Sequence, residues 1–254
     1  MKRLVDISLS LFGLMLSAPI LLPVMFLIYR QDKHSPFYVA PRVGRGGVPF
    51  RMIKLRSMIH GADKTGVDST GAADPRITGV GRFVRRYKLD ELPQLINVFK
   101  GDMSLVGPRP NVKRETDLYT EIERHLLDVK PGVTDIASIV FADENDILKD
   151  QEDPDIAYNQ LIRPWKSRLG LLYVEKRSVA LDLRLIFLTA LTLVSRSRAL
   201  IKIQTVLDDL QADSELRKVA TRREPLVPTP PPGAREIVKA RAPISVVKPR
   251  DVEA

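Results

Sequence analysis

The sequence of 254 residues contains no cysteine, which excludes disulfide bonds and thiolate metal ligands. Its three histidines, His34, His60 and His125, lie far apart along the chain, so a zinc site is not expected. Aromatic residues make up 6% of the chain, with a single tryptophan. Without an aromatic stacking platform or a recognition helix, the sequence predicts no nucleic acid partner.

Positive charge, by contrast, is abundant. The chain has 40 lysines and arginines against 31 acidic residues, which gives a formal net charge of +9. This excess favours anionic partners such as phosphorylated metabolites or an anionic membrane surface. The length allows one sizeable core with a small appendage.

The N-terminal segment has an uncharged, mostly apolar run from Ile7 to Tyr29. As a straight helix this run would be about 35 Å long, roughly the hydrocarbon thickness of a bilayer. A cleaved signal peptide is disfavoured, because the run continues well past the small residues Ser17 and Ala18. A membrane-inserted helix over residues 1–33 is therefore predicted.

Two prolines, Pro19 and Pro23, lie in the middle of this predicted helix, with Ser17 just before them. Each removes a backbone donor and clashes with the preceding turn, at a cost of about 3 kcal/mol in a regular helix interior. A break there would let the helix dip into one leaflet and return. Both basic ends, Lys2 and Arg3 at the start and Arg30 and Lys33 at the finish, would then lie in the cytosol. The residues leave a spanning and a re-entrant helix both open.

The rest of the chain predicts an α+β fold: a small cytosolic domain of helices with a short β-hairpin or sheet, at residues 34–205. Gly44, Gly46 and Gly47 fit a hairpin turn better than a phosphate cradle, which needs a strand followed by a helix. Helices are predicted at 91–100, ending at Gly101, and at 111–130. A short strand precedes Arg109.

The segment at 157–197 reads as helices interrupted near Pro164. Its basic residues beside Trp165 suit either helices at a membrane interface or ordinary core helices. Residues 206–254 form a C-terminal extension, and the proline-rich composition from about residue 222 predicts disorder.

The stretch RFVRRYKLDELPQL, residues 82–95, places four cations ahead of two adjacent acids, Asp90 and Glu91. Helix capping is one explanation, because acids at a helix N-terminus gain about 0.3–1 kcal/mol. A reactive site is the other, since neighbouring helical side chains diverge by about 100° and one acid can face a substrate while the other binds a metal or a supporting group. The cations are expected to keep Asp90 ionised and to bind phosphate oxygens, as phosphoryl transfer requires.

The stretch KLDELPQLINVFKGDMSLVGPRP, residues 88–110, resembles the signature of the bacterial sugar transferases, the monotopic phosphoglycosyl transferases. Flanking segments agree with it: the basic and apolar N-terminus with its proline, FRMIKLRSM at 50–58, DPRITGVGRFVRR at 74–86 and VKPGVTD at 129–135. The resemblance covers about residues 1–200, and the C-terminal tail lies outside it.

The resemblance implies an Mg²⁺-dependent enzyme that transfers a phosphosugar from a UDP-sugar to polyprenol (undecaprenyl) phosphate. The transfer releases UMP and initiates polysaccharide, exopolysaccharide or glycoconjugate synthesis. The family's nucleophilic aspartate, which forms a covalent phosphosugar intermediate, corresponds to Asp90. Glu91 matches the second acid, and both acids are expected metal ligands. The same matching gives the expected phosphate and nucleotide contacts Lys54, Arg56, Arg85, Arg109 and Arg42.

Three departures from the family pattern stand out. Ala18 replaces the usual serine before Pro19, and Ala40 stands where a glutamine is common. The Gly-Arg that often follows the Pro-Gly-x-Thr element is missing, and Asp143 and Glu144 stand nearby, as a solvated acidic loop or as a substrate contact. Because of this change, the resemblance does not indicate which sugar is transferred.

The resemblance also implies a location in the bacterial inner membrane, with the catalytic domain facing the cytosol and lipid as a partner. The sequence allows a homodimer. The alternative to an enzyme is a membrane-tethered basic adaptor that binds anionic lipid or a protein without catalysis.

Overall fold

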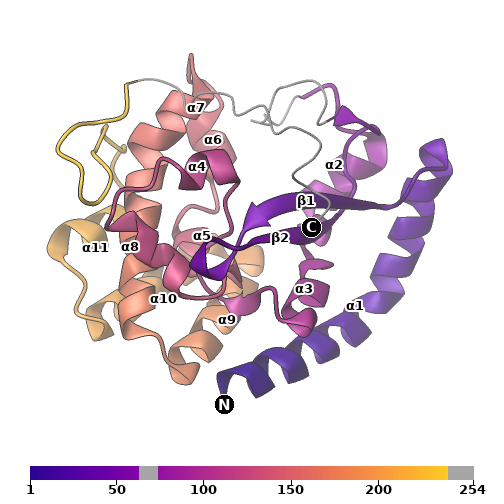
Figure 1. Ribbon diagram of the computed structural model, residues 1–254, viewed down its shortest axis with the longest axis horizontal. Coiled ribbons are helices and arrows are strands. Elements are labelled where there is room, and N and C mark those ends of the chain that lie inside the picture. The colour runs from indigo at the N-terminus through magenta and orange to yellow at the C-terminus, as the bar shows by residue number, and fades with distance from the viewer. Residues whose placement is uncertain (63–73, 240–254) are drawn as a thin grey trace.

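The computed structural model describes residues 1–62 and 74–239 (Figure 1). A long N-terminal helix, α1 (Lys2–Asp32), runs along one side of a domain in which helices surround two small β-sheets. The mixed class predicted from the sequence is confirmed. Residues 240–254 of the predicted disordered tail lie outside the described residues.

The first sheet is an antiparallel hairpin of β1 (Phe37–Val43) and β2 (Pro49–Leu55). The turn between them contains a short 3₁₀ helix, η1 (Arg45–Gly47), in which Gly46 and Gly47 have φ of 67° and 80°. Glycine adopts this left-handed backbone without steric cost. The predicted hairpin is confirmed: β1 leads through this turn into a second strand, whereas a phosphate cradle needs a strand that leads into an α-helix.

The second sheet pairs β3 (Ser104–Val106) in parallel with β4 (Gly132–Thr134). Immediately after β3 the backbones of Gly107 and Gly132 approach so closely that a Cβ on Gly132 would lie 2.1 Å from the Gly107 nitrogen. This contact fixes the start of the loop that carries Arg109 between two prolines, whose rings restrict φ.

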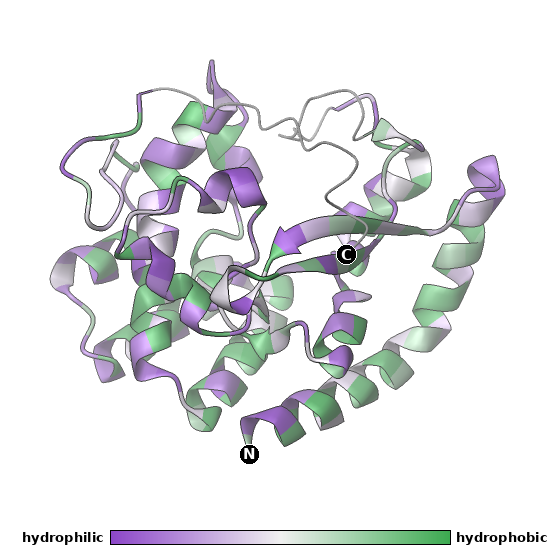
Figure 2. Ribbon diagram, in the orientation of Figure 1, coloured by the Kyte–Doolittle hydropathy of each residue, from purple (hydrophilic) through white to green (hydrophobic). Residues whose placement is uncertain are grey.

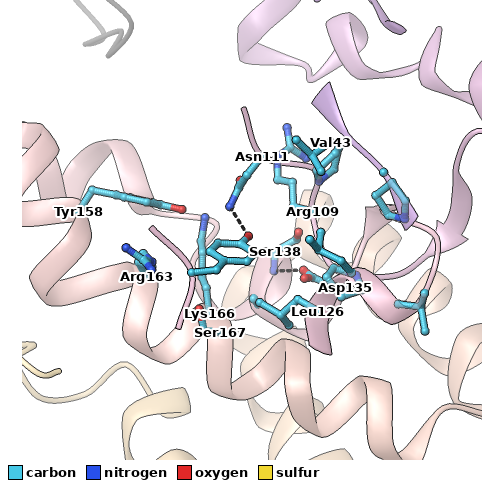
Figure 3. Close-up of a pocket in the computed structure, with 18 residues that line it drawn as sticks. Val43, Arg109, Asn111, Leu126, Asp135, Ser138, Tyr158, Arg163, Lys166 and Ser167 are labelled. Atoms are coloured by element: carbon cyan, nitrogen blue, oxygen red, sulfur yellow. Dashed lines mark hydrogen bonds between the residues drawn. The ribbon is translucent and has the colours of Figure 1, made fainter. Parts of the chain in front are cut away.

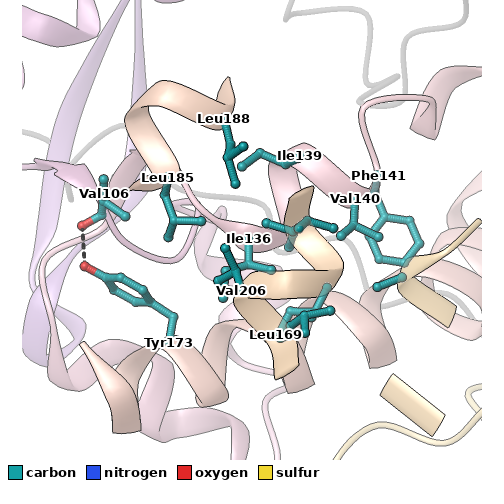
Figure 4. Packing of buried hydrophobic residues seen from close by; sticks show 14 of the residues in the cluster. Val106, Ile136, Ile139, Val140, Phe141, Leu169, Tyr173, Leu185, Leu188 and Val206 are labelled. Carbon is teal, nitrogen blue, oxygen red and sulfur yellow. Dashed lines mark hydrogen bonds between the residues drawn. The ribbon is translucent and has the colours of Figure 1, made fainter. Parts of the chain in front are cut away.

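The main core lies where β3 and β4 meet the helices α5 (Ile136–Val140), α8 (Arg163–Lys176), α9 (Val179–Val194), α10 (Arg196–Asp209) and α11 (Ser214–Ala220). Figure 4 shows Ile136, Leu169, Leu185 and Val206 packed together in it. Trp165 is only 2% exposed. The core interpretation of α8 therefore holds, whereas α9 keeps exposed apolar residues such as Phe187 and Val194.

The single helix predicted at 111–130 is wrong. The segment contains a short helix, α4 (Lys113–Thr116), and a separate 3₁₀ helix, η4 (Glu123–Asp128). Thr120 and Glu123 explain the interruption. The Thr120 hydroxyl accepts a hydrogen bond from the Glu123 amide, and the Glu123 carboxylate accepts one from the Thr120 amide, a reciprocal pair that starts a new helix.

The predicted interruption near Pro164 is confirmed. Two short helices, α6 (Glu144–Leu148) and α7 (Pro154–Ala157), lead into a π-helical turn, η5 (Tyr158–Ile162), and α8 begins immediately after it. Pro164 lies in the first turn of α8, where its missing N–H leaves no hydrogen bond unmade.

Helix α1 is apolar along most of its length (Figure 2), and it is the only described helix long and apolar enough to cross a membrane. Figure 1 shows that its two halves run in different directions. Pro19 and Pro23 lie inside it, and the Ser17 hydroxyl donates to the Leu14 carbonyl at 3.2 Å. The helix therefore bends, as predicted, but it does not break, and both prolines lie within one continuous helix.

The N-terminal end of α1 is bonded to the domain. Lys2 donates to the Asp182 carboxylate of α9 at 2.5 Å, and Arg3 donates to the Val98 and Phe99 carbonyls. The buried Asp6 carboxylate accepts hydrogen bonds from the Ser104 hydroxyl and the Leu105 amide of β3. These charge-assisted bonds are of the stronger kind in proteins.

The C-terminal end of α1 is attached to the same domain. Asp32 accepts two hydrogen bonds from the Arg56 guanidinium, which lies just after β2. Before that end, Leu21, Val24 and Ile28 pack against Leu55 and the helix α2 (Gly79–Arg86). Both ends of α1 thus belong to one folded unit.

Residues 222–239 form no helix or strand, but they lie against η5, α8 and the segment just before η4. Their hydrogen bonds join Thr120 to Pro232, Gln160 to Thr229 and Val238, and Arg168 to Pro230. Composition predicts disorder here because proline-rich sequence cannot form a core of its own. Donors and a carbonyl acceptor on the neighbouring segments supply the partners that such a segment lacks in isolation.

Candidate active site

Asp90 and Glu91 lie on a 3₁₀ turn, η3 (Leu89–Glu91), between α2 and α3 (Gln94–Lys100). Lys88, just before the turn, has a left-handed φ of 55°. The predicted end of α3 at Gly101 is confirmed, with a φ of 99° at that glycine. The two acids therefore sit in a tight connection between helices.

Glu91 is paired with Arg109. Both Nη atoms of the guanidinium donate to the two oxygens of the carboxylate, and the Lys54 ammonium lies 4.0 Å from the same carboxylate. Burial alone would raise the pKa of Glu91, but the charges of Arg109 and Lys54 outweigh it and hold that pKa at about 2. Glu91 is therefore a permanent anion that orients Arg109.

Asp90 has a different environment. Its Oδ1 atom is buried and has no hydrogen-bond partner. Burial, and then the charge of Glu91, raises the pKa of Asp90 above its usual value, against the opposing charges of Lys54, Lys88 and Arg85. The sequence predicts that cations dominate at Asp90, but most of their effect falls on Glu91 instead. Asp90 is thus left with an unused oxygen.

Three predicted cations surround the two acids. Lys54 comes from β2, and Arg109 comes from the loop after β3. Arg85 comes from the last turn of α2, where its Nε atom donates to the Ser57 hydroxyl at 2.8 Å. Burial lowers the pKa of Arg85, against the charge of Asp90.

Burial and then the positive charges of Arg109 and Arg42 lower the pKa of Lys54 to about 8, although Glu91 and Asp90 oppose the shift. Arg42 lies on β1, on the strand next to that of Lys54. Arg42 therefore lies at the edge of the group of cations formed by Lys54, Arg85 and Arg109.

Arg56 lies elsewhere. Its guanidinium bonds to Asp32 and to the Ser35 and His34 carbonyls, and its side chain is 7% exposed. Its donors are engaged at the end of α1, so the structure does not bring Arg56 together with the two acids, and its phosphate contact stays a prediction. Of the arginines in the 82–86 run, Arg82 and Arg86 are exposed, and only Arg85 turns inward.

The acids at 143 and 144 have separate partners. Asp143 lies within 2.8 Å of the Arg196 guanidinium and 3.3 Å of that of Arg222. Glu144 forms an ion pair with Lys166 of α8. The interpretation as a solvated acidic loop is therefore wrong, and Asp143 joins the C-terminal segment to the domain.

Asn97 is a site residue that the sequence interpretation missed. It is buried in α3; its side-chain oxygen accepts from the Ile53 amide, and its side-chain nitrogen donates to the Arg51 carbonyl. These bonds attach β2 to α3, and so fix Lys54 relative to Asp90. An asparagine within an otherwise apolar helical stretch was the available signal.

The family model described as "Bacterial sugar transferase" matches residues 1–196. The chain belongs to the bacterial sugar transferase family. This bacterial sugar transferase is 45% identical over 120 residues to a putative undecaprenyl-phosphate N-acetylgalactosaminyl 1-phosphate transferase of Bacillus subtilis, with coverage of 47% of this chain and 65% of the relative. It is 38% identical over 192 residues to a UDP-glucose:undecaprenyl-phosphate glucose-1-phosphate transferase of Klebsiella pneumoniae, with coverage of 74% and 39%.

A third relative, the uncharacterised sugar transferase EpsL of Bacillus subtilis, is 34% identical over 189 residues, which cover 74% of this bacterial sugar transferase and 85% of the relative. The chain spans less than two thirds of the length of several other relatives, such as the Klebsiella enzyme. The signature recognised in the sequence and the family match agree, and the two acids and Arg109 lie within the matched range.

Proposed function

We propose that this bacterial sugar transferase moves a phosphosugar from a UDP-sugar to undecaprenyl phosphate, and so initiates the synthesis of a polysaccharide or glycoconjugate. The observation that carries the proposal is the Asp90 carboxylate, which has an unpartnered buried oxygen next to the Glu91–Arg109 pair. The printed names of the relatives supply the two substrates. UMP release from labelled UDP-sugars by membranes with polyprenol phosphate and magnesium tests it, and a membrane-tethered adaptor would release none.

Asp90 acts as the nucleophile in a two-step reaction. In the first step an Asp90 oxygen bonds to the phosphorus next to the sugar, the bond from that phosphorus to the bridging oxygen breaks, and UMP leaves. In the second step an oxygen of polyprenol phosphate bonds to the same phosphorus, and the Asp90 carboxylate leaves. The product is a polyprenyl diphosphate sugar. Two anionic substrates therefore need not occupy the site together.

The surrounding cations bind the diphosphate. Arg109 is held by Glu91 and presents its guanidinium between two prolines, while Lys54 and Arg85 approach from β2 and α2. Guanidinium groups bind phosphate oxygens in a bidentate manner, and a positioned cation stabilises the charge that develops on them during transfer. Glu91 thus acts on the substrate through Arg109.

The residues present also fit Mg²⁺. This ion binds proteins through one or two carboxylates and takes its other ligands from substrate phosphates and water. Within residues 1–62 and 74–239 no three acidic or histidine side chains cluster as a complete metal site would require. Asp90, which has an unpartnered oxygen, would hold the ion together with Glu91, whose carboxylate would be shared between the ion and Arg109; the ion would supply positive charge to the phosphate oxygens.

Lys54 should give the reaction a basic pH limit. Its pKa of about 8 means that the ammonium form, which binds phosphate, is lost as the pH rises through that value. We expect kcat/KM for UMP release, which reports the free enzyme, to fall above about pH 8. In Lys54→Arg the fall should move to higher pH, because arginine keeps its proton.

The matched control for this profile is Lys100→Arg, the same change at an exposed lysine at the end of α3. It should leave the profile where it is in the wild type. If the basic limb stays in place in Lys54→Arg, another group sets it, and Lys54 does not bind the phosphate as a cation.

We further propose that α1 is re-entrant and that the domain faces the cytosol of a bacterial inner membrane. A helix of this length that crosses a bilayer places its two ends about 30 Å or more apart on opposite sides of the hydrocarbon. Here Lys2, Arg3 and Asp6 at one end and Asp32 at the other bond to one continuous domain. The exposed large apolar residues of the helix, such as Leu16, lie between those ends and suit insertion into one leaflet.

Single cysteines test this topology, because the chain has none of its own. We expect a cysteine inserted after Met1 and one at Gln31→Cys to react with an impermeant thiol reagent only from the cytosolic side. Glu236→Cys, an exposed site on the domain, is the positive control. Leu16→Cys should not react in intact membranes. Labelling of the two ends of α1 from opposite sides would contradict the re-entrant helix.

A further inference from the structure

A cavity adjoins the proposed catalytic site at Arg109. It is open to solvent and lies between the loop at 108–111, the start of α5, η4 and one face of η5 and α8 (Figure 3). Arg109 lines this cavity and is also the partner of Glu91, so the diphosphate site and the cavity share one guanidinium. A group attached to a phosphate at Arg109 could therefore extend into the cavity.

The donor has such a group. During displacement at phosphorus the nucleophile and the leaving UMP lie roughly in line. The sugar oxygen, which stays on the phosphorus, projects to the side of that line. The sugar begins one bond from the phosphorus that Asp90 attacks, so it must occupy space next to the cations that hold that phosphate.

The polar groups at the cavity suit hydroxyl groups. The Lys166 ammonium lines it and is paired with the Glu144 carboxylate of α6, which gives a donor and an acceptor side by side. Lys166 is 20% exposed and Glu144 33% exposed, so both remain accessible to a ligand. The charge of Glu144 also contributes, after that of Glu91, to raising the pKa of Arg109.

A nucleoside fits this lining less well. Uracil binding commonly uses an open aromatic face for stacking. The two tyrosines that line the cavity each have a cation over the ring: Arg163 lies 5.6 Å from the Tyr119 centroid, and Lys166 lies 5.5 Å from that of Tyr158. The charged and amide groups of the lining, such as Lys166 and Asn111, are of the kind that binds sugar hydroxyls.

We propose that this cavity holds the sugar of the UDP-sugar donor, and that Lys166 and Glu144 contact its hydroxyl groups and determine which sugar is accepted. The inference rests on the proposed function and deepens it. Asp143, the neighbouring acid, takes no part, because its partners are Arg196 and Arg222. The two adjacent acids that the sequence leaves unassigned thus have different roles.

Binding measurements test the proposal directly. In an Asp90→Asn background, which prevents turnover, the dissociation constants of UDP and of UDP-glucose, UDP-galactose, UDP-N-acetylglucosamine and UDP-N-acetylgalactosamine are measured for the parent and for Lys166→Met and Glu144→Gln. We expect the UDP-sugar that the parent binds most tightly to bind about tenfold more weakly in each variant. UDP, which carries no sugar, should change less than twofold.

The exposed pair Arg184–Asp209 on α9 and α10 supplies matched controls. Arg184→Met and Asp209→Asn should change neither the dissociation constant of UDP nor that of the preferred UDP-sugar. Lys166→Arg, which keeps the charge and the fold, should alter the order of preference among the sugars. If UDP and the UDP-sugars weaken equally, or if no UDP-sugar binds differently from UDP in the parent, the inference is wrong. Failure of the proposed function is a separate result: the enzyme with Asp90 intact then releases no UMP from any of these donors.

Discussion

Asp90→Asn is expected to lower UMP release by at least about a thousandfold and to remove any covalent phosphosugar from the protein. The amide of asparagine has nearly the shape of the carboxylate, but it lacks the charge and the nucleophilicity of the oxygen. Mass spectrometry of acid-quenched turnover mixtures should find the phosphosugar on the peptide that contains residue 90 in the wild type. The measurement needs a UDP-sugar and no acceptor, so that the intermediate accumulates.

The same change should not harm the fold. In the native state the pKa of Asp90 is raised by burial and by Glu91, so the ionised form opposes folding at neutral pH. We therefore expect the midpoint of thermal unfolding of Asp90→Asn to equal or exceed that of the wild type. Asp117→Asn, at an exposed acid of α4's C-terminal end, is the activity control. More than a tenth of wild-type activity in Asp90→Asn, or an adduct on another residue, would exclude Asp90 as nucleophile.

Glu123→Gln should have the largest effect on stability. The Glu123 side chain is fully buried; it accepts two hydrogen bonds from Arg163, at 3.1 and 2.6 Å, and one from Ser167 at 2.7 Å. Glutamine leaves the Arg163 cation buried without a counter-charge, which typically costs about 3–5 kcal/mol in the free energy of unfolding. In a chain of this size that loss lowers the midpoint of thermal unfolding by roughly 10 °C.

Two further variants make this test specific. Glu121→Gln changes an exposed glutamate two residues earlier and should shift the midpoint by no more than about 2 °C. The double variant Glu123→Gln/Arg163→Met removes both charges and should recover much of the stability lost in the single variant. If Glu123→Gln unfolds at the wild-type temperature, the pair does not stabilise this part of the fold.

Local features of the fold were predictable because nearby residues determine them. The glycines at 44–47 require a turn whatever else surrounds them, and Gly101 ends α3 through its own backbone conformation. Pro164 sets the start of α8 for the same reason. The helix predicted at 111–130 failed on a local signal that was overlooked, since Thr120 and Glu123 have the spacing of a capping pair.

The different surroundings of the two acids in the candidate site were predictable, whereas the partners of the cations were less so. Adjacent carboxylates on a tight helical turn must face different surroundings, and Asp90 and Glu91 do. Which cation serves which acid depends on packing between distant segments: Arg109 reaches Glu91 from the loop after β3, while Arg56 turns to Asp32. The spacing of these residues along the chain does not predict which cation pairs with which acid. The side of α3 that carries Asn97 was missed for the same reason.

The attachment of α1 limits how the enzyme can be handled. Its first turn supplies the partners of Asp182 and of the last carbonyls of α3, and Asp6 supplies the acceptor for β3, the strand that leads to Arg109. A truncated, water-soluble fragment without residues 1–33 would lose those bonds together with the apolar wall formed by Leu21, Val24 and Ile28. The apolar helix therefore forms a wall of the folded domain in addition to its proposed place in the membrane, and we expect purification of the folded protein to require that residues 1–33 be kept.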